Sequence, residues 1–239
     1  MAHQITGKIR YSETGSDGVL TTDGLVNYFQ DCSFDQSETI GYGIEYLKEN
    51  HVAWLLSYWD IHINRLPRLK EEVVVKTWPY GFKGFFGYRN FVMETSEGEM
   101  LACANSLWVY IDTTTGKPAK APQEEMEAYG NGEPLDLPKI NRKIRLPEQM
   151  EKEDEREVLP FFIDTNQHMN NGKYILLAQQ YLKQNEKPKR ISVEYRREAL
   201  LGATLVIKTN RQDNTLTVSI EDKEENPYAI VQMELEEVM

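Results

Sequence analysis

The same order of elements occurs twice along this chain: a strand, one apolar helix, and then several long strands separated by turns. No helix is predicted between those long strands, so neighbouring strands need no crossover connection and should be antiparallel. A helix that is apolar on most sides, like the second one here, is typical of a helix wrapped by a sheet. The order therefore predicts an α+β fold in which two domains each contain one long helix wrapped by an antiparallel sheet.

The predicted helices span about 23–40, where apolar residues recur at helical spacing behind Asp23, and about 171–183. Alternating and β-branched runs predict the strands. In the first half these are 5–11, 53–63, 72–78, 87–95 and 100–112, and in the second half 156–163, 190–197, 203–210, 215–221 and 228–237.

Residues 116–157 contain many prolines, glycines and charges, which is typical of an exposed connector. We therefore expect an N-terminal domain over 1–115, a connector over 116–157 and a C-terminal domain over 158–239. A weak repeat supports the doubling: segment 63–77 matches 195–209 at a constant offset of 132, whereas the predicted helix starts lie 148 apart. One such match can arise by chance, but together with the repeated element order it favours duplication.

The chain has 239 residues and a net charge of -11, from 27 basic and 38 acidic residues. Such an excess of acid argues against general nucleic-acid binding, which depends on Lys and Arg. Cys32 and Cys103 have neither CxxC spacing nor a histidine cluster, so two buried thiols are expected rather than disulfides or zinc. No apolar run is long enough for a membrane span or a signal core, so a cytoplasmic protein without stable membrane insertion is expected.

Asp164, Asn166 and His168 alternate at period two just before the second helix. In extended backbone their side chains would point to one side, beside a helix N-terminus that favours negative charge. That combination could polarise a carbonyl group. The alternative is a polar turn that caps the helix. Asp164 and His168 could also ligate a metal ion, but no third ligand is identifiable, and neither a metal nor a cofactor is expected.

Glu194, Arg196 and Glu198 alternate in the same way on a later strand. Taken alone, this pattern favours a solvated strand face with cross-strand ion pairs. Other chemistries lack their motifs: GxSxG, GxxxxGK[ST] and HExxH are all absent from the sequence.

These two segments resemble the acyl-acyl carrier protein thioesterases. That family combines Asp-x-Asn-x-His-x-Asn-Asn at a helix start with a later Glu-Tyr-Arg-Arg-Glu strand, as in 164–171 and 194–198 here. The early helix at 25–30 and the strand at 54–59 are also similar to the family's first half. The resemblance implies two tandem hotdog domains and, because no N-terminal extension is present, a bacterial member rather than a plastid one.

The resemblance also implies an activity, which is hydrolysis of the thioester between a fatty acyl chain and acyl carrier protein in fatty-acid biosynthesis. Glu198 would activate water, His168 and Asn166 would bind the thioester oxygen, and Asp164 would orient this group or attack directly, with the two carboxylate roles exchangeable. Plant relatives commonly have Cys after the second Glu, but this chain has Ala199, so a Cys-His-Asn mechanism cannot operate there. An acyl-coenzyme A thioesterase and a non-catalytic acyl-binding protein remain alternatives.

The first half lacks an Asp-x-Asn-x-His segment, and the resemblance implies that it binds the acyl chain. Candidate lining residues, each of which could equally be core, are Leu25, Phe29, Trp54, Leu56 and Trp59. Segment 183–211 carries eight basic and three acidic residues, so an acidic carrier protein could dock there. The docking candidates are Lys187, Lys189, Arg190, Arg196 and Arg197. Chain-length preference and homodimer formation are left open by the sequence.

Overall fold

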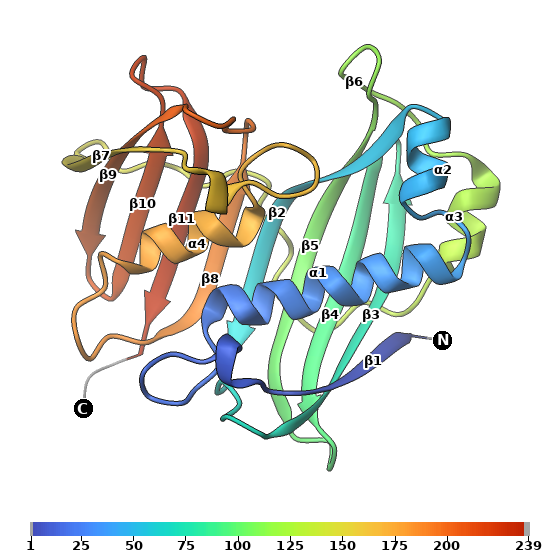
Figure 1. The fold of residues 1–239 in the computed structure, drawn as a ribbon, viewed down its shortest axis with the longest axis horizontal. Coiled ribbons are helices and arrows are strands. Elements are labelled where there is room, and N and C mark those ends of the chain that lie inside the picture. Colours follow the sequence, from blue (N-terminus) through green and yellow to red (C-terminus); the bar gives the residue numbers. More distant parts are fainter. Residues whose placement is uncertain (1, 237–239) are drawn as a thin grey trace. The chain divides into compact units, whose positions relative to one another are not determined.

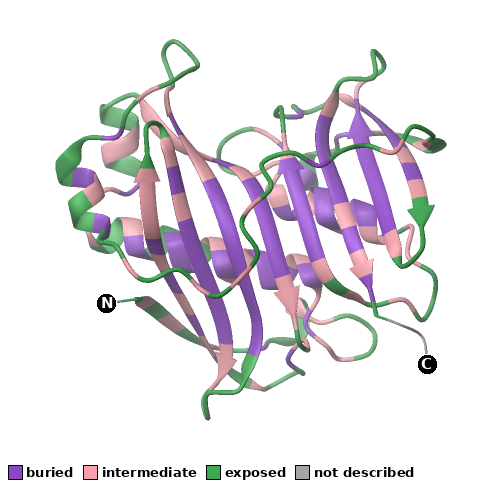
Figure 2. Cartoon of the chain, turned by 180° about the vertical axis from the view of Figure 1, so that it is seen from behind, coloured by how far each residue is buried: buried purple, intermediate pink, exposed green. Residues whose placement is uncertain are grey.

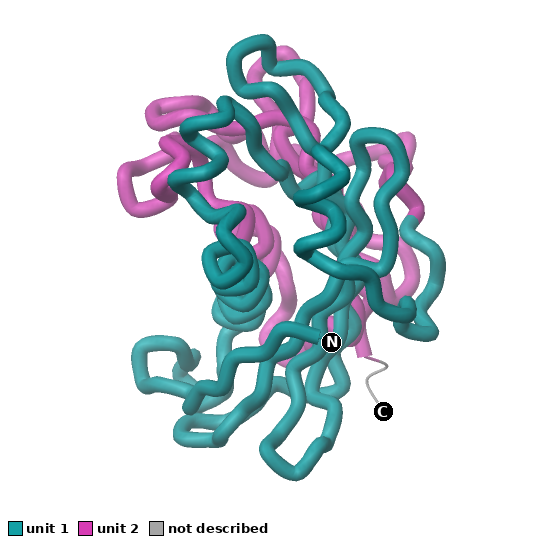
Figure 3. The backbone as a smooth tube through the Cα atoms, turned by 90° about the vertical axis from the view of Figure 1, so that its right-hand side faces the viewer, with its two compact units in different colours: residues 1–140 teal, residues 141–239 magenta. Residues whose placement is uncertain are grey.

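The computed structural model of the chain describes residues 2–236 (Figure 1). These fall into two compact units, residues 1–140 and residues 141–239 (Figure 3). No helix of the described part is both long enough and apolar enough to cross a membrane.

The first unit is an antiparallel sheet with a long helix, α1 (Thr22–Thr39), across one face (Figure 1). The helix starts after Thr21, whose hydroxyl accepts the N–H of Gly24 at 3.2 Å. Leu25, Phe29 and Cys32 are fully buried at helical spacing. The sheet order is β1-β3-β4-β5-β2, made of β1 (His3–Lys8), β2 (Val52–Ile63), β3 (Glu72–Lys83), β4 (Phe86–Thr95) and β5 (Met100–Asp112), with β6 (Lys117–Pro118) beside β5.

The second unit repeats this plan with helix α4 (Asn171–Gln179), which packs against β11. Its strand order is β8-β11-β10-β9-β7, made of β7 (Glu151–Glu157), β8 (Pro188–Tyr195), β9 (Thr204–Gln212), β10 (Thr215–Glu221) and β11 (Pro227–Leu235). Buried residues concentrate in the inner strands of each unit, among them β4, β5, β10 and β11 (Figure 2). The predicted α+β plan is confirmed.

Several predicted boundaries differ from the structure. The strand expected over 156–163 is wrong: β7 ends at Glu157, and a 3-10 helix, η2 (Pro160–Phe162), follows, because Pro160 has no N–H for a sheet. The helix expected to reach 183 ends at Gln179. The last strand was expected to reach 237, which lies outside the described residues.

The segment expected as an exposed connector, 116–157, is divided between the units. Its first part includes a short helix, α3 (Gln123–Tyr129), and then runs along the sheet, where the N–H of Leu135 donates to Asn90 at 2.9 Å. Its last part is β7. Asn90 is fully buried, and a buried amide needs hydrogen-bond partners. The segment therefore completes the hydrogen bonding of a buried side chain. Two further short helices, η1 (Tyr11–Glu13) and α2 (Ile44–Glu49), were not predicted.

The two units share a loop of the same backbone pattern in front of their long helices. Loop 14–20 is closed by a Thr14–Leu20 bridge and loop 163–169 by an Ile163–Met169 bridge, and each leads into a helix cap. The equivalent hydrogen bonds are 2.9 Å from the N–H of Gly15 to Val19 and 3.0 Å from that of Asp164 to His168. The caps Thr21 and Asn170 lie 149 residues apart, so the predicted helix offset of 148 is wrong by one.

Segments 63–77 and 195–209 also correspond in structure, at the offset of 132 seen in the sequence. The N–H of Leu20 donates to the carbonyl of Pro67 at 2.8 Å, and that of Met169 donates to Ala199 at 2.9 Å. Even the left-handed residues correspond: Gly18 (φ 72°) with Gln167 (φ 67°), and Lys70 (φ 69°) with Gly202 (φ 79°). A residue in one unit therefore has a defined counterpart in the other.

Candidate active site

Loop 163–169 carries three of the predicted catalytic residues, but not in extended backbone. The chain reverses inside the loop, with Gln167 in the left-handed region at φ 67°. Asp164 and His168 therefore lie opposite each other at the neck of the loop, and Asn166 lies at its exposed tip. The prediction that all three side chains share one side of a strand is wrong, because the hydrogen bond from Asp164 to His168 closes the turn.

His168 lies between two carboxylates. Its Nδ1 is 3.9 Å from Asp164 Oδ1, and its Nε2 is 3.7 Å from Glu198 Oε1. Both distances exceed a direct hydrogen bond but are within reach of a small side-chain rotation, and catalytic contacts are often long before substrate binds. The His168 and Asp164 side chains are 16% and 20% exposed, whereas Glu198 is 52% exposed and open to water.

Asp164 is also held by its own loop. Its Oδ1 accepts the N–H of Asn166 at 2.8 Å. This is the local side-chain bond that Asp commonly forms in turns. The carboxylate is therefore oriented toward His168 by the turn that carries both residues.

Glu198 reaches the site because the chain leaves the sheet after β8. The N–H groups of Arg196 and Arg197 both donate to the carbonyl of Tyr228, at 2.8 and 3.3 Å, so the strand pairing stops there. The backbone of Ala199 then pairs with the site loop through Met169. Glu198 thereby lies opposite His168.

Glu194 and Arg196, which alternate with Glu198 in the sequence, have a different role. Glu194 is buried and accepts the Nε of Arg196 at 2.8 Å and the N–H of Ile144 at 2.7 Å. The alternative interpretation expected ion pairs here, but on a solvated face and across strands; the pair is instead formed within one segment and its carboxylate is buried. The expected alternation of three side chains on one face therefore extends only to Glu194 and Arg196.

Tyr174 of α4 also contacts the Glu198 segment, and we did not single it out from the sequence. Its hydroxyl accepts the N–H of Ala199 at 3.2 Å. Burial raises the pKa of Tyr174 above its usual range, so the hydroxyl keeps its proton. In the sequence this tyrosine is one of many large residues on an apolar helix, and only its hydroxyl could have indicated a polar role.

The first unit has the same loop and the same backbone hydrogen bonds, but other side chains at the equivalent positions. The counterparts of Asp164, Asn166, His168 and Glu198 are Gly15, Asp17, Val19 and Leu66. No imidazole flanked by two carboxylates can form from this set. The combination of Asp164, His168 and Glu198 around one imidazole is therefore particular to the second unit.

Four of the predicted lining residues, Leu25, Phe29, Leu56 and Trp59, are buried in the first unit. Phe29 and Trp59 form an aromatic cluster with Phe91, with ring centroids 4.9–6.0 Å apart. Trp54 is partly exposed and donates its Nε1–H to Glu125 at 2.8 Å. The register of β2 against β5 shifts between Leu56 and Tyr58, which lets Trp54, Leu56 and Trp59 share the face toward α1.

Three of the predicted docking residues are engaged in ion pairs. Arg190 pairs with Glu234 at 2.9 Å, Arg196 pairs with Glu194, and Arg197 pairs with Asp222 at 2.6 Å. Lys187 and Lys189 are exposed and have no ion pair with an acidic residue of the described part of the chain. Among the predicted docking positions, these two lysines are therefore the ones whose ammonium groups are free of an ion pair within the described residues.

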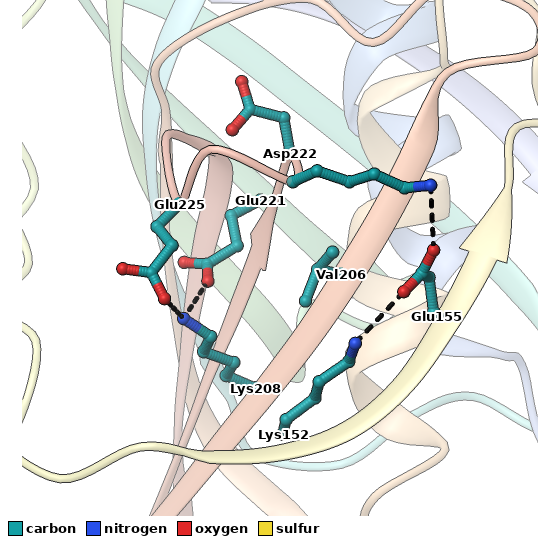
Figure 4. A pocket seen from close by; sticks show the side chains of 8 residues that line it. Lys152, Glu155, Val206, Lys208, Glu221, Asp222 and Glu225 are labelled. Atoms are coloured by element: carbon teal, nitrogen blue, oxygen red, sulfur yellow. Dashed lines mark hydrogen bonds and ion pairs between the residues drawn. The ribbon is translucent and has the colours of Figure 1, made fainter.

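A charged hollow between β7, β9 and the end of β10 shares no residue with this site (Figure 4). Lys208 pairs there with Glu221 and Glu225, and Glu155 pairs with Lys152 at 3.0 Å and Lys223 at 3.3 Å. The fourth acidic residue of the lining, Asp222, pairs with Arg197, so each lysine and each carboxylate of the hollow has an ion-pair partner. Within residues 2–236, no group of three His, Cys, Asp or Glu side chains is placed to hold a metal ion. Cys32 and Cys103 are free and buried, as predicted.

Family models match both units: the acyl-ACP thioesterase N-terminal domain covers residues 2–129 and the C-terminal domain covers residues 147–236. The chain belongs to the acyl-ACP thioesterase family. The proposed site falls within the match to the family's C-terminal domain. The predicted tandem hotdog architecture is confirmed by solved structures of the same fold, including an acyl-ACP thioesterase of Bacteroides thetaiotaomicron with a TM-score of 0.88, 23% identity and 98% of each chain covered.

Curated relatives include chloroplastic palmitoyl-acyl carrier protein thioesterases. The Arabidopsis thaliana protein is 30% identical over 210 residues, which cover 80% of this chain and 50% of that protein. The Gossypium hirsutum protein is 25% identical over 232 residues, which cover 88% of this chain and 56% of that protein. This member of the acyl-ACP thioesterase family thus spans about half the length of these relatives.

Proposed function

We propose that this chain hydrolyses the thioester of fatty acyl-acyl carrier protein and releases the free fatty acid. The observation that carries the proposal is the placement of His168 between Asp164 and Glu198, each within 4 Å, in the segment that matches the family's C-terminal domain. The exposed Glu198 carboxylate can meet water, while the less exposed Asp164 is held by its turn.

In the proposed reaction, Glu198 accepts a proton from water as the water oxygen bonds to the thioester carbon. The carbonyl oxygen takes up the electron pair and is stabilised by a ring N–H of His168. The intermediate then collapses, the carbon–sulfur bond breaks, and the proton held by Glu198 goes to the departing sulfur. Asp164 orients His168. A role for Asn166 as a second donor rests on its position in the loop, and Asn166→Ala tests it directly.

The acyl chain is proposed to bind in the first unit. This unit keeps the loop and helix of the fold, but has Val19 and Leu66 in place of His168 and Glu198. Its face toward α1 is lined by large apolar residues, among them Phe29 and Trp59. Chemistry would thus belong to one unit and chain-length selection to the other.

Docking of the carrier protein is proposed at Lys187 and Lys189. The protein has a net charge of -11, and the carrier expected from the family is also acidic, so contact needs an unbalanced basic surface. We expect Lys187→Glu/Lys189→Glu to slow association with the acyl carrier substrate and to reduce its dependence on salt. Hydrolysis of a small uncharged thioester should not change.

The matched control for docking is Lys117→Glu/Lys120→Glu, which makes the same charge change at two exposed lysines of the first unit. If both double variants slow association equally, net charge and not a local surface is responsible. If Lys187→Glu/Lys189→Glu has no effect, the carrier docks elsewhere.

The test of the proposed function is a free-thiol assay on a series of acyl carrier proteins that carry chains of increasing length, beside the matching acyl-coenzyme A series. We expect faster turnover of the carrier-bound substrates. Faster turnover of the coenzyme A series would favour the acyl-coenzyme A alternative. Acyl binding without thiol release from either series would show a non-catalytic protein.

A further inference from the structure

We propose that Tyr174 is a positioning residue that holds Glu198 beside His168 through the backbone of Ala199. Tyr174 lies on α4 and belongs to none of the motifs that the sequence indicated. The inference rests on the proposed hydrolase function, because it assigns the tyrosine a role in that same site.

Ala199 is fixed at both of its backbone polar groups. Its N–H donates to the Tyr174 hydroxyl at 3.2 Å, and its carbonyl accepts the N–H of Met169 at 2.9 Å. Ala199 is fully buried, so its N–H would have no water to replace the hydroxyl. One bond ties the residue after Glu198 to the helix, and the other ties it to the residue after His168.

The Tyr174 ring itself is firmly placed. It is 2% exposed and lies edge-on to Tyr195, with ring centroids 5.8 Å apart. The Tyr195 hydroxyl is committed elsewhere, since it donates to the carbonyl of Asn171 at 2.9 Å. Tyr174 can therefore act as a fixed support. Tyr195 lies three residues before Glu198 in the same segment, but its hydroxyl bonds to Asn171 and not to Ala199.

The first unit provides an internal comparison. At the offsets of the two repeats, 132 and 149, the counterpart of Ala199 is Pro67 and the counterpart of Tyr174 is Leu25. Proline has no N–H and leucine has no hydroxyl, so both partners of the bond are missing together. In that unit the residue before Pro67 is Leu66, which has no carboxylate to position. The bond thus occurs in the copy that carries Glu198.

A small displacement of Glu198 would be costly. Its carboxylate lies 3.7 Å from His168, and a shift of about 1 Å in a catalytic group can cost on the order of 100-fold in rate. The side chain is half exposed, so its direction depends on the backbone that carries it. Loss of the Ala199 bond should therefore reduce turnover more than substrate binding.

The test is Tyr174→Phe, which removes one oxygen and keeps the ring, with Tyr195→Phe as the matched control. We expect Tyr174→Phe to lower kcat by about 10- to 100-fold with KM within about twofold, and Tyr195→Phe to retain wild-type kinetics. We also expect Tyr174→Phe to cause little further loss in a Glu198→Gln background, because the group that it positions is already disabled. Equal losses in both backgrounds, or wild-type turnover of Tyr174→Phe, would overturn the proposal.

A second measurement does not depend on the reaction. Amide hydrogen exchange at Ala199 should be faster in Tyr174→Phe than in the wild type and in Tyr195→Phe, because the bond to the hydroxyl is lost. Unchanged exchange would overturn the positioning role even in an active enzyme. If the wild type releases no thiol from any acyl carrier substrate, the proposed function fails, while the exchange experiment still tests the contact.

Discussion

Replacing Glu198 with Gln tests whether this carboxylate activates water or only supports His168 by its charge. Glutamine keeps the size of the side chain and removes both the charge and the basic oxygen. The two roles predict losses of different size. They can be separated because the distance from Glu198 Oε1 to His168 Nε2 is 3.7 Å and the carboxylate is 52% exposed.

Charge support has its upper limit when His168 carries a full charge, and two unit charges at this distance interact by ~1 kcal/mol at the dielectric constant of water and by ~4 kcal/mol at an effective constant of about 20. A half-exposed carboxylate lies nearer the first limit, so charge support alone predicts a loss of about sixfold in kcat. A lost general base predicts about 100- to 10,000-fold. We expect a loss of at least about 100-fold.

The assay is steady-state release of free thiol from an acyl carrier substrate, with Glu224→Gln as the control at an exposed glutamate of the same unit. A loss of about sixfold or less in Glu198→Gln would refute the assignment of Glu198 as the base. Mass spectrometry of enzyme quenched during turnover checks the exchanged roles. We expect no acyl adduct, and an adduct on Asp164 would show direct attack instead.

Three other perturbations have defined outcomes. Burial raises the pKa of Glu125, so the stability that its protonated form contributes is present below the ordinary pKa and is lost as pH rises through the raised one. In urea unfolding, the free energy of unfolding of Glu125→Gln should therefore rise relative to that of the wild type as pH increases. A difference that stays constant with pH would contradict this. Leu25→Ala/Leu56→Ala should lengthen the preferred acyl chain by about two carbons and change relative turnover roughly tenfold, since each buried methylene contributes ~0.8 kcal/mol. If the double variant only loses stability, both residues belong to the core and do not line the acyl site. Gly202→Ala places a side chain at φ 79° and should lower the free energy of unfolding by about 1 kcal/mol in thermal melts, which an unchanged melting temperature would contradict.

The fold was predictable from the sequence because its main elements have clear periodicity. Helix α1 buries Leu25, Phe29 and Cys32 at helical spacing, and long strands without intervening helices pair as neighbours. Helix α3 was missed although it has local signals: Pro122 precedes it and Gly130 ends it at φ 75°. Its charged, proline-rich surroundings are typical of a loop, and the hydrogen bonds that attach the following segment to the sheet are visible only in three dimensions.

The sequence indicated the candidate residues of the proposed site but not the shape of the loop that carries them. Residue types and spacing indicated Asp164 and His168, the family resemblance added Glu198, and the structure places all three together. Their period-two spacing also suggested a strand, because nothing in the sequence shows that Gln167 adopts a left-handed conformation, as its counterpart Gly18 also does. Tyr174 was hidden for another reason: its role depends on one backbone N–H from a segment 25 residues away.

The two units place glycine at different members of the same pair of left-handed positions, and this difference indicates where the protein could be stabilised. Each copy has a glycine at one left-handed position, Gly18 or Gly202, and a longer side chain at the other, Lys70 or Gln167. A non-glycine residue in this conformation costs ~1–2 kcal/mol, of which the added freedom of glycine in the unfolded chain offsets about half. Lys70→Gly should therefore raise the free energy of unfolding, because the equivalent position of the other unit already has Gly202. Gln167 lies between two proposed catalytic residues, so glycine at that position would remove the same backbone strain but could loosen the loop that carries the site. Comparison of the two units therefore distinguishes a position where glycine only stabilises from one where it also affects the site.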